Sequence, residues 1–223
     1  KFAYDLISNY PLDILNISLI IDAKINLLDD LLDEIINKNE KAFYIIELIK
    51  LDAEIHQKEI SPEMRKTISK YFSKILSIAI TEEIYKDKIK NSNNFKDRLD
   101  YAVDCYNFKS LVMDIYFELP LMRNNFNRKQ IDKILFFTRI LRAVSLVYKD
   151  FLDLEHDQNN NTETPVLIIY TEEKQKFNLY LEEIIDKYKK QCVENDISIK
   201  NQNLKDMVSK IKNKIINKSL KLE

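Results

Sequence analysis

The sequence predicts an all-α protein, and two observations lead to this class. Apolar residues recur three and four positions apart along nearly the whole chain, which is the period of an amphipathic helix. The strict alternation of apolar and polar residues that marks a half-buried strand is nearly absent. We therefore expect long helices packed on one another and no sheet.

Clusters of Pro, Ser, Asn and Thr divide this pattern into helical segments. The breaks fall at 9–11, 37–39, 61–63, 91–94, 123–127, 157–165 and 195–196. Pro11 and Pro62 stand where a first helical turn tolerates proline. The breaks imply about eight helices, several of them about thirty residues long, and helices of that length must pack against each other. No linker separates them, so we expect one domain over residues 1–223, built as a single bundle of mostly antiparallel helices.

Composition excludes several classes of function. The chain has 35 basic and 36 acidic residues and a net charge of -1, which is unlike a nucleic-acid-binding protein. It has no glycine, so a Walker loop, a dinucleotide-binding fingerprint and a nucleophile elbow are absent. Two cysteines and two histidines form no zinc spacing. Without a long apolar run or a signal-peptide pattern, we expect a cytoplasmic protein with no membrane span.

The segment "LLDDLLDEIINKNE" places three carboxylates, Asp29, Asp30 and Asp33, within an otherwise apolar helix. The apolar stripe of this helix is predicted to be Ile21, Ile25, Leu28, Leu32 and Ile35. Asp29 and Asp33 are four residues apart, so they repel by a few tenths of a kcal/mol unless a cation lies between them. The acids either face water or hold a cation.

Lys109, in "CYNFKSLVMDIY", emerges from a mostly apolar stripe of its helix. The stripe consists of Ala102, Cys105, Val112, Met113 and Tyr116. The ammonium group either reaches the surface along its alkyl chain or meets an anion held inside the bundle.

A second acidic stretch, "VSLVYKDFLDLEHD", carries Asp150, Asp153 and Asp157 within one arc of roughly 60° of another long helix. Arg139 and Arg142 fall on the same side. The stripe is either an ordinary surface of weak salt bridges or one wall of a binding site.

Four segments, "SLIIDAKINLLDDLLDE", "YNFKSLV", "VSLVYKDFLDLEHD" and "TETPVLIIY", resemble in order the signatures of trans-isoprenyl diphosphate synthases, which belong to the class I isoprenoid and terpene synthase superfamily. The matching residues are Asp29, Asp30 and Asp33 of the first Asp-rich motif, Lys109 and Ser110 of the lysine-threonine pair, Asp150 and Asp153 of the second acidic motif, and Thr164 and Pro165 of the Thr-x-Pro element. The resemblance covers roughly residues 15–170 and implies a bundle around a central cavity.

The resemblance implies a prenyltransferase that binds an allylic isoprenoid diphosphate through about two or three Mg²⁺ ions and ionises it for chain elongation. It assigns metal binding to Asp29, Asp30, Asp33, Asp150 and Asp153. It assigns diphosphate binding to Lys109, Lys149, Arg142 and Lys38, and catalysis to the first three aspartates with Lys109. It also implies a homodimer, or a heterodimer with a catalytic homologue.

The sequence departs from this family at several positions. Lys149 stands in place of the first aspartate of the second motif, and Leu146 in place of a glutamine. Lys24 lies one turn before Asp29, and "EIINKNEKAFY" lacks the family's arginine pair. Two alternatives therefore stay open: a non-catalytic partner subunit of a heteromeric prenyl synthase, and an unrelated helical interaction protein.

Overall fold

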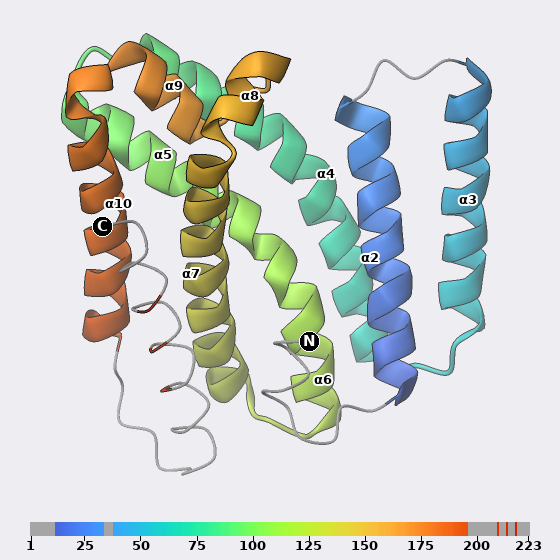
Figure 1. Cartoon of the computed structure of the whole chain (residues 1–223). Helices are drawn as coiled ribbons and strands as arrows, with labels where there is room; N and C mark the ends of the chain where they lie inside the picture. The colour runs from blue at the N-terminus through green and yellow to red at the C-terminus, as the bar shows by residue number, and fades with distance from the viewer. Residues whose placement is uncertain (1–11, 34–37, 196–208, 210–212, 214–216, 218–223) are drawn as a thin grey trace. The chain divides into compact units, whose positions relative to one another are not determined.

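The computed structural model describes residues 12–33 and 38–195, together with the single residues 209, 213 and 217. Every regular element in these ranges is a helix, which confirms the all-α prediction (Figure 1). The elements are α2 (Leu12–Asp33), α3 (Lys38–Gln57), α4 (Pro62–Asn91), α5 (Phe95–Lys109), the 3-10 helix η1 (Ser110–Met113), α6 (Asp114–Arg123), α7 (Arg128–Leu152), α8 (Leu154–Asn160), α9 (Pro165–Glu172), the 3-10 helix η2 (Lys174–Lys176) and α10 (Phe177–Glu194). Within the same ranges, none of the helices combines the length and the apolar character that a membrane span needs.

The chain divides into two compact units. Unit 1 comprises Lys1–Ala79 and Ile115–Asn127, and unit 2 comprises Ile80–Asp114 and Arg128–Glu223. Helix α4 therefore contributes its first part to unit 1 and its last part to unit 2. The expectation of a single domain stays a prediction.

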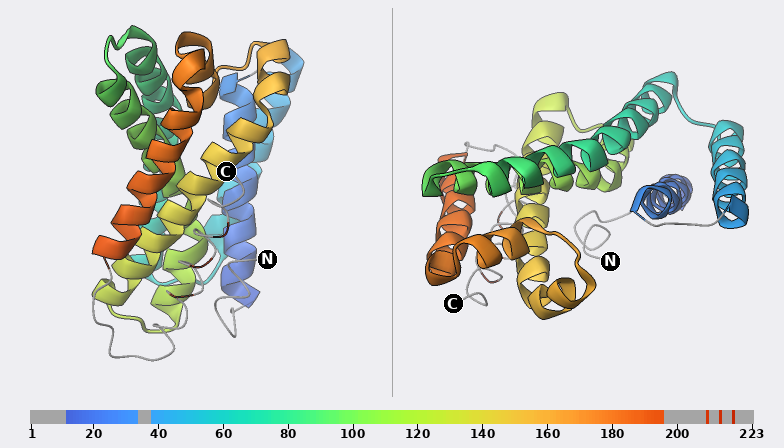
Figure 2. Two further views of the ribbon diagram at one scale, coloured as in Figure 1. Left: turned by 60° about the vertical axis from the view of Figure 1, so that its left-hand side comes forward. Right: turned by 90° about the horizontal axis from the view of Figure 1, so that it is seen from above.

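Unit 1 is held together by apolar residues from α2, α3, α4 and α6. Its core consists of Ile14, Ile17, Ile20, Ile21, Ile55, Met64, Ile68, Tyr71, Ile115 and Leu119. The predicted stripe of α2 is confirmed where it is described, because Ile21 is fully buried and Ile25 packs against this core. Helices α2 and α3 lie side by side (Figure 2).

Unit 2 is organised around α7, against which α5, η1, α9 and α10 pack. The inward face of α7 repeats at three and four spacing through Ile134, Phe137, Leu141, Val144 and Val147, all of them buried. Tyr188 of α10 adds a directed contact, because its hydroxyl donates a hydrogen bond to the Val103 carbonyl at 3.2 Å. This packing fixes the mutual placement of the side chains on α5 and α7.

Asparagine takes the place of glycine at two chain reversals. Asn125, between α6 and α7, and Asn161, which caps the C-terminus of α8, adopt φ of 59° and 55°. Asparagine tolerates this left-handed region better than most residues with a side chain. Both reversals fall within breaks that the sequence predicted.

Candidate functional site

Lys109 lies at the C-terminus of α5 and pairs with a carboxylate of α4. Its Nζ donates a hydrogen bond to Glu82 Oε1 at 2.6 Å, and Lys86 Nζ lies 3.2 Å from the same oxygen. Burial alone would raise the pKa of Glu82, but Lys109 and Lys86 outweigh it and hold this pKa below its usual value. Glu82 is therefore ionised at neutral pH, and two cations surround one mostly buried anion. Of the two alternatives for Lys109, the structure shows the contact with an anion. This anion is the Glu82 carboxylate of the chain itself.

Asp150 is the buried acid of α7. Only 6% of the residue is exposed, and its Oδ2 accepts a hydrogen bond from the Tyr106 hydroxyl at 2.8 Å. Burial raises the pKa of Asp150, the Tyr106 hydrogen bond and the charge of Lys109 oppose this rise, and the carboxylate of Asp157 adds to it. A buried carboxyl group with a raised pKa is a typical feature of functional sites, although structural networks also produce it.

Lys109 and Asp150 thus belong to one polar cluster inside unit 2. We call it the Lys109–Asp150 cluster, and it consists of Glu82, Lys86, Tyr106, Lys109 and Asp150. The charges of this cluster also act on the Cys105 thiol. Burial, and after it the charge of Glu82, raises the pKa of this thiol to about 12. Cys105 is therefore a packing residue and no nucleophile at neutral pH.

The raised pKa of Asp150 predicts a dependence of stability on pH. Because the folded protein holds this proton more tightly than the unfolded chain, the stabilisation is complete below the unfolded pKa and is lost as the pH rises through the folded pKa. Asp150→Asn removes this ionisation, so the free energy of unfolding of the variant relative to the parent should increase from about pH 4 to about pH 7, measured by urea denaturation. Asp153→Asn is the half-exposed control, and an effect of Asp150→Asn that is the same at both pH values would contradict the assignment.

The other acids of the second acidic motif have surroundings that differ from those of Asp150. Helix α7 ends at Leu152 and α8 begins at Leu154, but the amides of Asp153 and Asp157 still donate hydrogen bonds to the carbonyls of Lys149 and Asp153, four residues earlier. Lys149 and Asp153 form a surface pair with Nζ and Oδ2 4.0 Å apart. Asp157, in α8, is buried and acts electrostatically on Asp150. Of the residues that the resemblance assigned here, Asp150 is a member of the Lys109–Asp150 cluster, and the charge of Lys149 also opposes the rise in the pKa of Asp150.

Arg139 and Arg142, both in α7, also have different surroundings. Arg139 binds both carboxylate oxygens of Asp114, each at 2.6 Å, and Asp114 is fully buried. Arg142, which the resemblance assigned to diphosphate binding, is exposed. Arg139 therefore has a structural task in unit 2.

The first Asp-rich motif closes α2. Asp29, Asp30 and Asp33 belong to this helix, but their side chains lie outside the described residues, as does the side chain of Lys38 at the start of α3. Their proposed roles stay predictions. The neighbouring Lys24 pairs with Asp52 of α3.

Two residues of the resemblance have a local structural role. Ser110 is buried, and its hydroxyl donates a hydrogen bond to the Asn107 carbonyl at 2.6 Å. Thr164 caps α9, since its Oγ1 accepts a hydrogen bond from the Leu167 amide at 3.2 Å, and Pro165 follows in the first turn.

The cap predicts a stability effect at Thr164. Thr164→Ala should lower the free energy of unfolding by about 1 kcal/mol because the Leu167 amide loses its acceptor. The measurement is urea denaturation, with the exposed Thr162→Ala as the matched control. Equal stability of the two variants would show that the cap contributes nothing.

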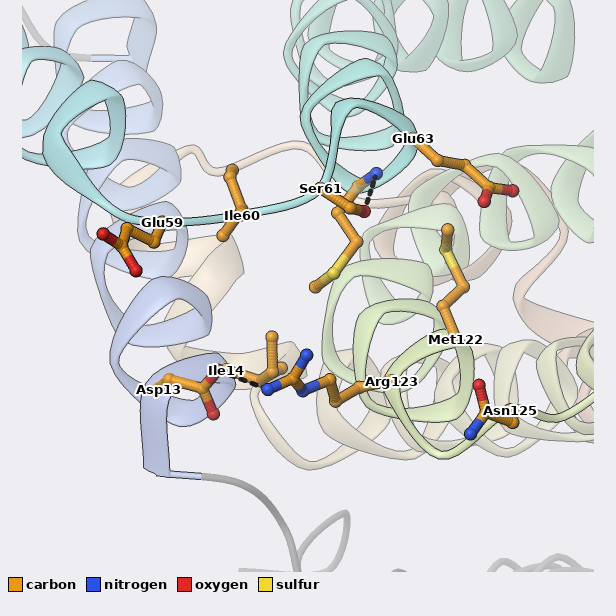
Figure 3. Close-up of a pocket in the computed structure, with 10 residues that line it drawn as sticks. Asp13, Ile14, Glu59, Ile60, Ser61, Glu63, Met122, Arg123 and Asn125 are labelled. Atoms are coloured by element: carbon orange, nitrogen blue, oxygen red, sulfur yellow. Dashed lines mark hydrogen bonds and ion pairs between the residues drawn. The ribbon is translucent and has the colours of Figure 1, made fainter.

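A pocket of about 160 Å³ lies in unit 1 (Figure 3). It is lined by Asp13, Ile14, Glu59, Ile60, Ser61, Glu63, Met64, Met122, Arg123 and Asn125. None of these is a predicted site residue, and the volume lies below the range of about 300–1,000 Å³ that ligand pockets usually have. The pocket is no candidate for an isoprenoid chain.

Three members of the cluster, Glu82, Lys86 and Tyr106, were not predicted. Glu82 is 27 residues from Lys109, and Tyr106 is 44 residues from Asp150. No local pattern links residues so far apart. In the described part of the chain, no group of three or more His, Cys, Asp or Glu side chains lies close enough to hold a metal ion.

Comparison of the chain with known protein families, curated proteins and solved structures yields no match.

Proposed function

We propose that this chain is a divergent protein of the isoprenyl diphosphate synthase type, which binds an allylic diphosphate with Mg²⁺ and promotes its ionisation. The observation that supports the proposal is the joint presence of Lys109 and Asp150 in one partly buried polar cluster. The resemblance assigns these residues to two separate motifs of one site, and they come from different helices. Neither the composition nor the local sequence pattern requires Lys109 and Asp150 to lie in one cluster.

The available side chains suit Mg²⁺ in kind. Mg²⁺ prefers hard oxygen ligands and is usually held by one or two carboxylates together with water and phosphate oxygens. Asp150 offers such a carboxylate within the cluster, and the resemblance adds Asp29, Asp30 and Asp33. When bound, the metal would act as a Lewis acid that stabilises charge on the departing diphosphate.

The residues of the Lys109–Asp150 cluster have separate tasks in this proposal. Lys109 exchanges Glu82 for a diphosphate oxygen, while Lys86 remains beside Glu82 and keeps that carboxylate neutralised. Tyr106 fixes the orientation of the Asp150 carboxylate through its hydrogen bond. The exchange at Lys109 and the hydrogen bond of Tyr106 to Asp150 both involve largely buried groups, where charge interactions are stronger than in water.

The test of this function is a turnover screen. The full chain is incubated with geranyl, farnesyl or geranylgeranyl diphosphate, with and without isopentenyl diphosphate, and pyrophosphate release is measured with Mg²⁺ or with a chelator. We expect Mg²⁺-dependent release that is lost in Asp29→Ala and in Asp33→Ala. The absence of release with every substrate would contradict catalysis.

Glu82 provides a further prediction within the cluster. Because its carboxylate competes with an anionic ligand for Lys109, Glu82→Gln should tighten the binding of Mg²⁺-pyrophosphate by about 2- to 10-fold, measured by calorimetry. Glu83→Gln is the matched control, since Glu83 is the adjacent residue and contacts Lys86 alone of the two lysines. Unchanged or weaker binding by Glu82→Gln would contradict the competition.

A second candidate is a non-catalytic partner subunit that retains the fold and acts on a catalytic homologue. The observation that favours it is the pairing of Lys149 with Asp153 at the surface, because a cation replaces one acid of the motif and faces another. Its signature is a stable heterodimer in co-purification, with a changed product length of the catalytic chain. A chain that turns over substrate alone would exclude it.

A further inference from the structure

The pocket of unit 1 has an apolar floor and a charged rim. Its floor is formed by four apolar side chains that belong to the core of the unit or pack against it, namely Ile14, Ile60, Met64 and Met122. Its rim is formed by four exposed charged side chains, namely Asp13, Glu59, Glu63 and Arg123. Three carboxylates and one guanidinium give this rim a net charge of -2. A ligand that suits the pocket therefore combines positive charge with an apolar stretch.

The negative charge of the rim is only partly neutralised by the chain. The Arg123 guanidinium lies 3.7 Å from a carboxylate oxygen of Asp13, and both side chains are more than half exposed (Figure 3). An exposed pair of this kind is weak. With the residues that the structure describes, Glu59 and Glu63 form no ion pair and no side-chain hydrogen bond. Two carboxylates thus stand at the pocket without a cation.

Helix α4 begins at Pro62, beside the pocket, and the N-terminus of a helix attracts anions. In this helix the chain itself meets that attraction. The Ser61 hydroxyl accepts a hydrogen bond from the Met64 amide at 3.2 Å, and Glu63 places a carboxylate in the first turn. The rim carboxylates, and not the helix end, therefore set the sign of the ligand.

We propose that this pocket binds an aliphatic diamine of the length of putrescine. Both amino groups of such a molecule are protonated at neutral pH, as the amino group of lysine is. The two ammonium groups balance the net charge of the rim, and the methylene chain between them covers the apolar floor. The pocket belongs to unit 1 and the Lys109–Asp150 cluster to unit 2, so this inference does not depend on the proposed function.

The volume of the pocket agrees with a ligand of this size. A cavity of about 150 Å³ in another protein holds benzene, which has as many non-hydrogen atoms as putrescine. The pocket of unit 1 measures about 160 Å³. Because the rim charges are exposed to water, we expect a dissociation constant on the order of 1 mM.

The first test follows the methionine methyl groups of the full chain by NMR during a titration with putrescine at constant ionic strength. Met64 and Met122 line the pocket, and Met113, in unit 2, is the internal control. We expect saturable shifts of the Met64 and Met122 signals and an unchanged Met113 signal. Absence of these shifts, or an equal shift of Met113, overturns the proposal.

Three further ligands test the chemistry of the site. The uncharged diol of the same chain length should leave the Met64 and Met122 signals unchanged, and butylamine should bind at least about 2-fold more weakly than putrescine. Mg²⁺ has the same charge without the methylene chain, so it should not reproduce the shifts. Binding of the diol, equal affinity for butylamine, or the same shifts with Mg²⁺ overturns the assignment of a diamine.

Substitutions in the rim test the charges one by one. Glu59→Gln and Glu63→Gln should each weaken putrescine binding by about 2- to 5-fold, and Arg123→Gln should tighten it by a similar factor because Asp13 loses its partner. Glu54→Gln is the matched control, since this acid pairs with Lys58 and does not line the pocket. Unchanged affinity in both pocket glutamine variants, or weaker binding by Arg123→Gln, overturns the proposal.

Discussion

Replacing Lys109 by alanine is expected to weaken the binding of Mg²⁺-pyrophosphate by about 10- to 100-fold, because a charge-assisted hydrogen bond in a largely buried cluster is lost. The Lys109 side chain is only 23% exposed, and its ammonium group already lies 2.6 Å from Glu82 Oε1. It is therefore localised near the site before a ligand arrives, and the exchange of Glu82 for a diphosphate oxygen offsets part of the gain from binding. Calorimetric titration of the full chain measures the effect.

The matched control for this prediction is Lys176→Ala. Lys176 is more than half exposed and forms a surface pair with Glu173. Its removal should leave pyrophosphate affinity unchanged, because exposed ion pairs contribute little. If both lysine variants bind as tightly as the parent protein, Lys109 is no ligand-binding residue.

The largest effect on stability is expected at Arg139. Arg139→Ala should lower the free energy of unfolding by about 3 kcal/mol, because it leaves the fully buried Asp114 carboxylate without the guanidinium that binds both of its oxygens. Urea denaturation at neutral pH measures the difference.

Arg142→Ala is the control in the same helix. Arg142 is exposed, so its replacement should change the free energy of unfolding by less than about 0.5 kcal/mol. A similar small change for Arg139→Ala would mean that the buried ion pair is energetically neutral, as some buried pairs are.

The helical class and most of the helix boundaries could be predicted from the sequence, because periodicity and helix-breaking residues are local signals. The reversal between α6 and α7 coincides with an asparagine cluster, and α9 begins at the Thr164 cap. Other boundaries had no such signal, and the end of α9 at Glu172 is one of them. Helix α5 gives way to η1 after Lys109 although the apolar period continues, and α7 ends before Asp153 in a stretch without proline or glycine. In both places the backbone stays helical or resumes a helix within two residues, and the apolar period does not mark the change that divides it.

The candidate site could be predicted only in part, for a related reason. Lys109 could be predicted because a charge within an apolar stripe is a visible anomaly, and Asp150 because it belongs to an acidic stretch that resembles a family motif. Their partners Glu82 and Tyr106 are ordinary residues of their own helices, and they acquire a role only when α4, α5 and α7 pack together. Helix geometry placed Asp153 beside Asp150 on one face, whereas its Oδ2 lies 4.0 Å from Nζ of Lys149, one turn earlier at the surface.

The most direct test of the central claim is a double-mutant cycle on the affinity for Mg²⁺-pyrophosphate, with Lys109→Ala, Asp150→Asn and the combined variant. If both residues serve one ligand site, the losses in binding free energy are not additive, and a coupling of at least about 1 kcal/mol is expected. Losses that add within about 0.5 kcal/mol, or a single variant that binds like the parent protein, would contradict the claim that Lys109 and Asp150 act together.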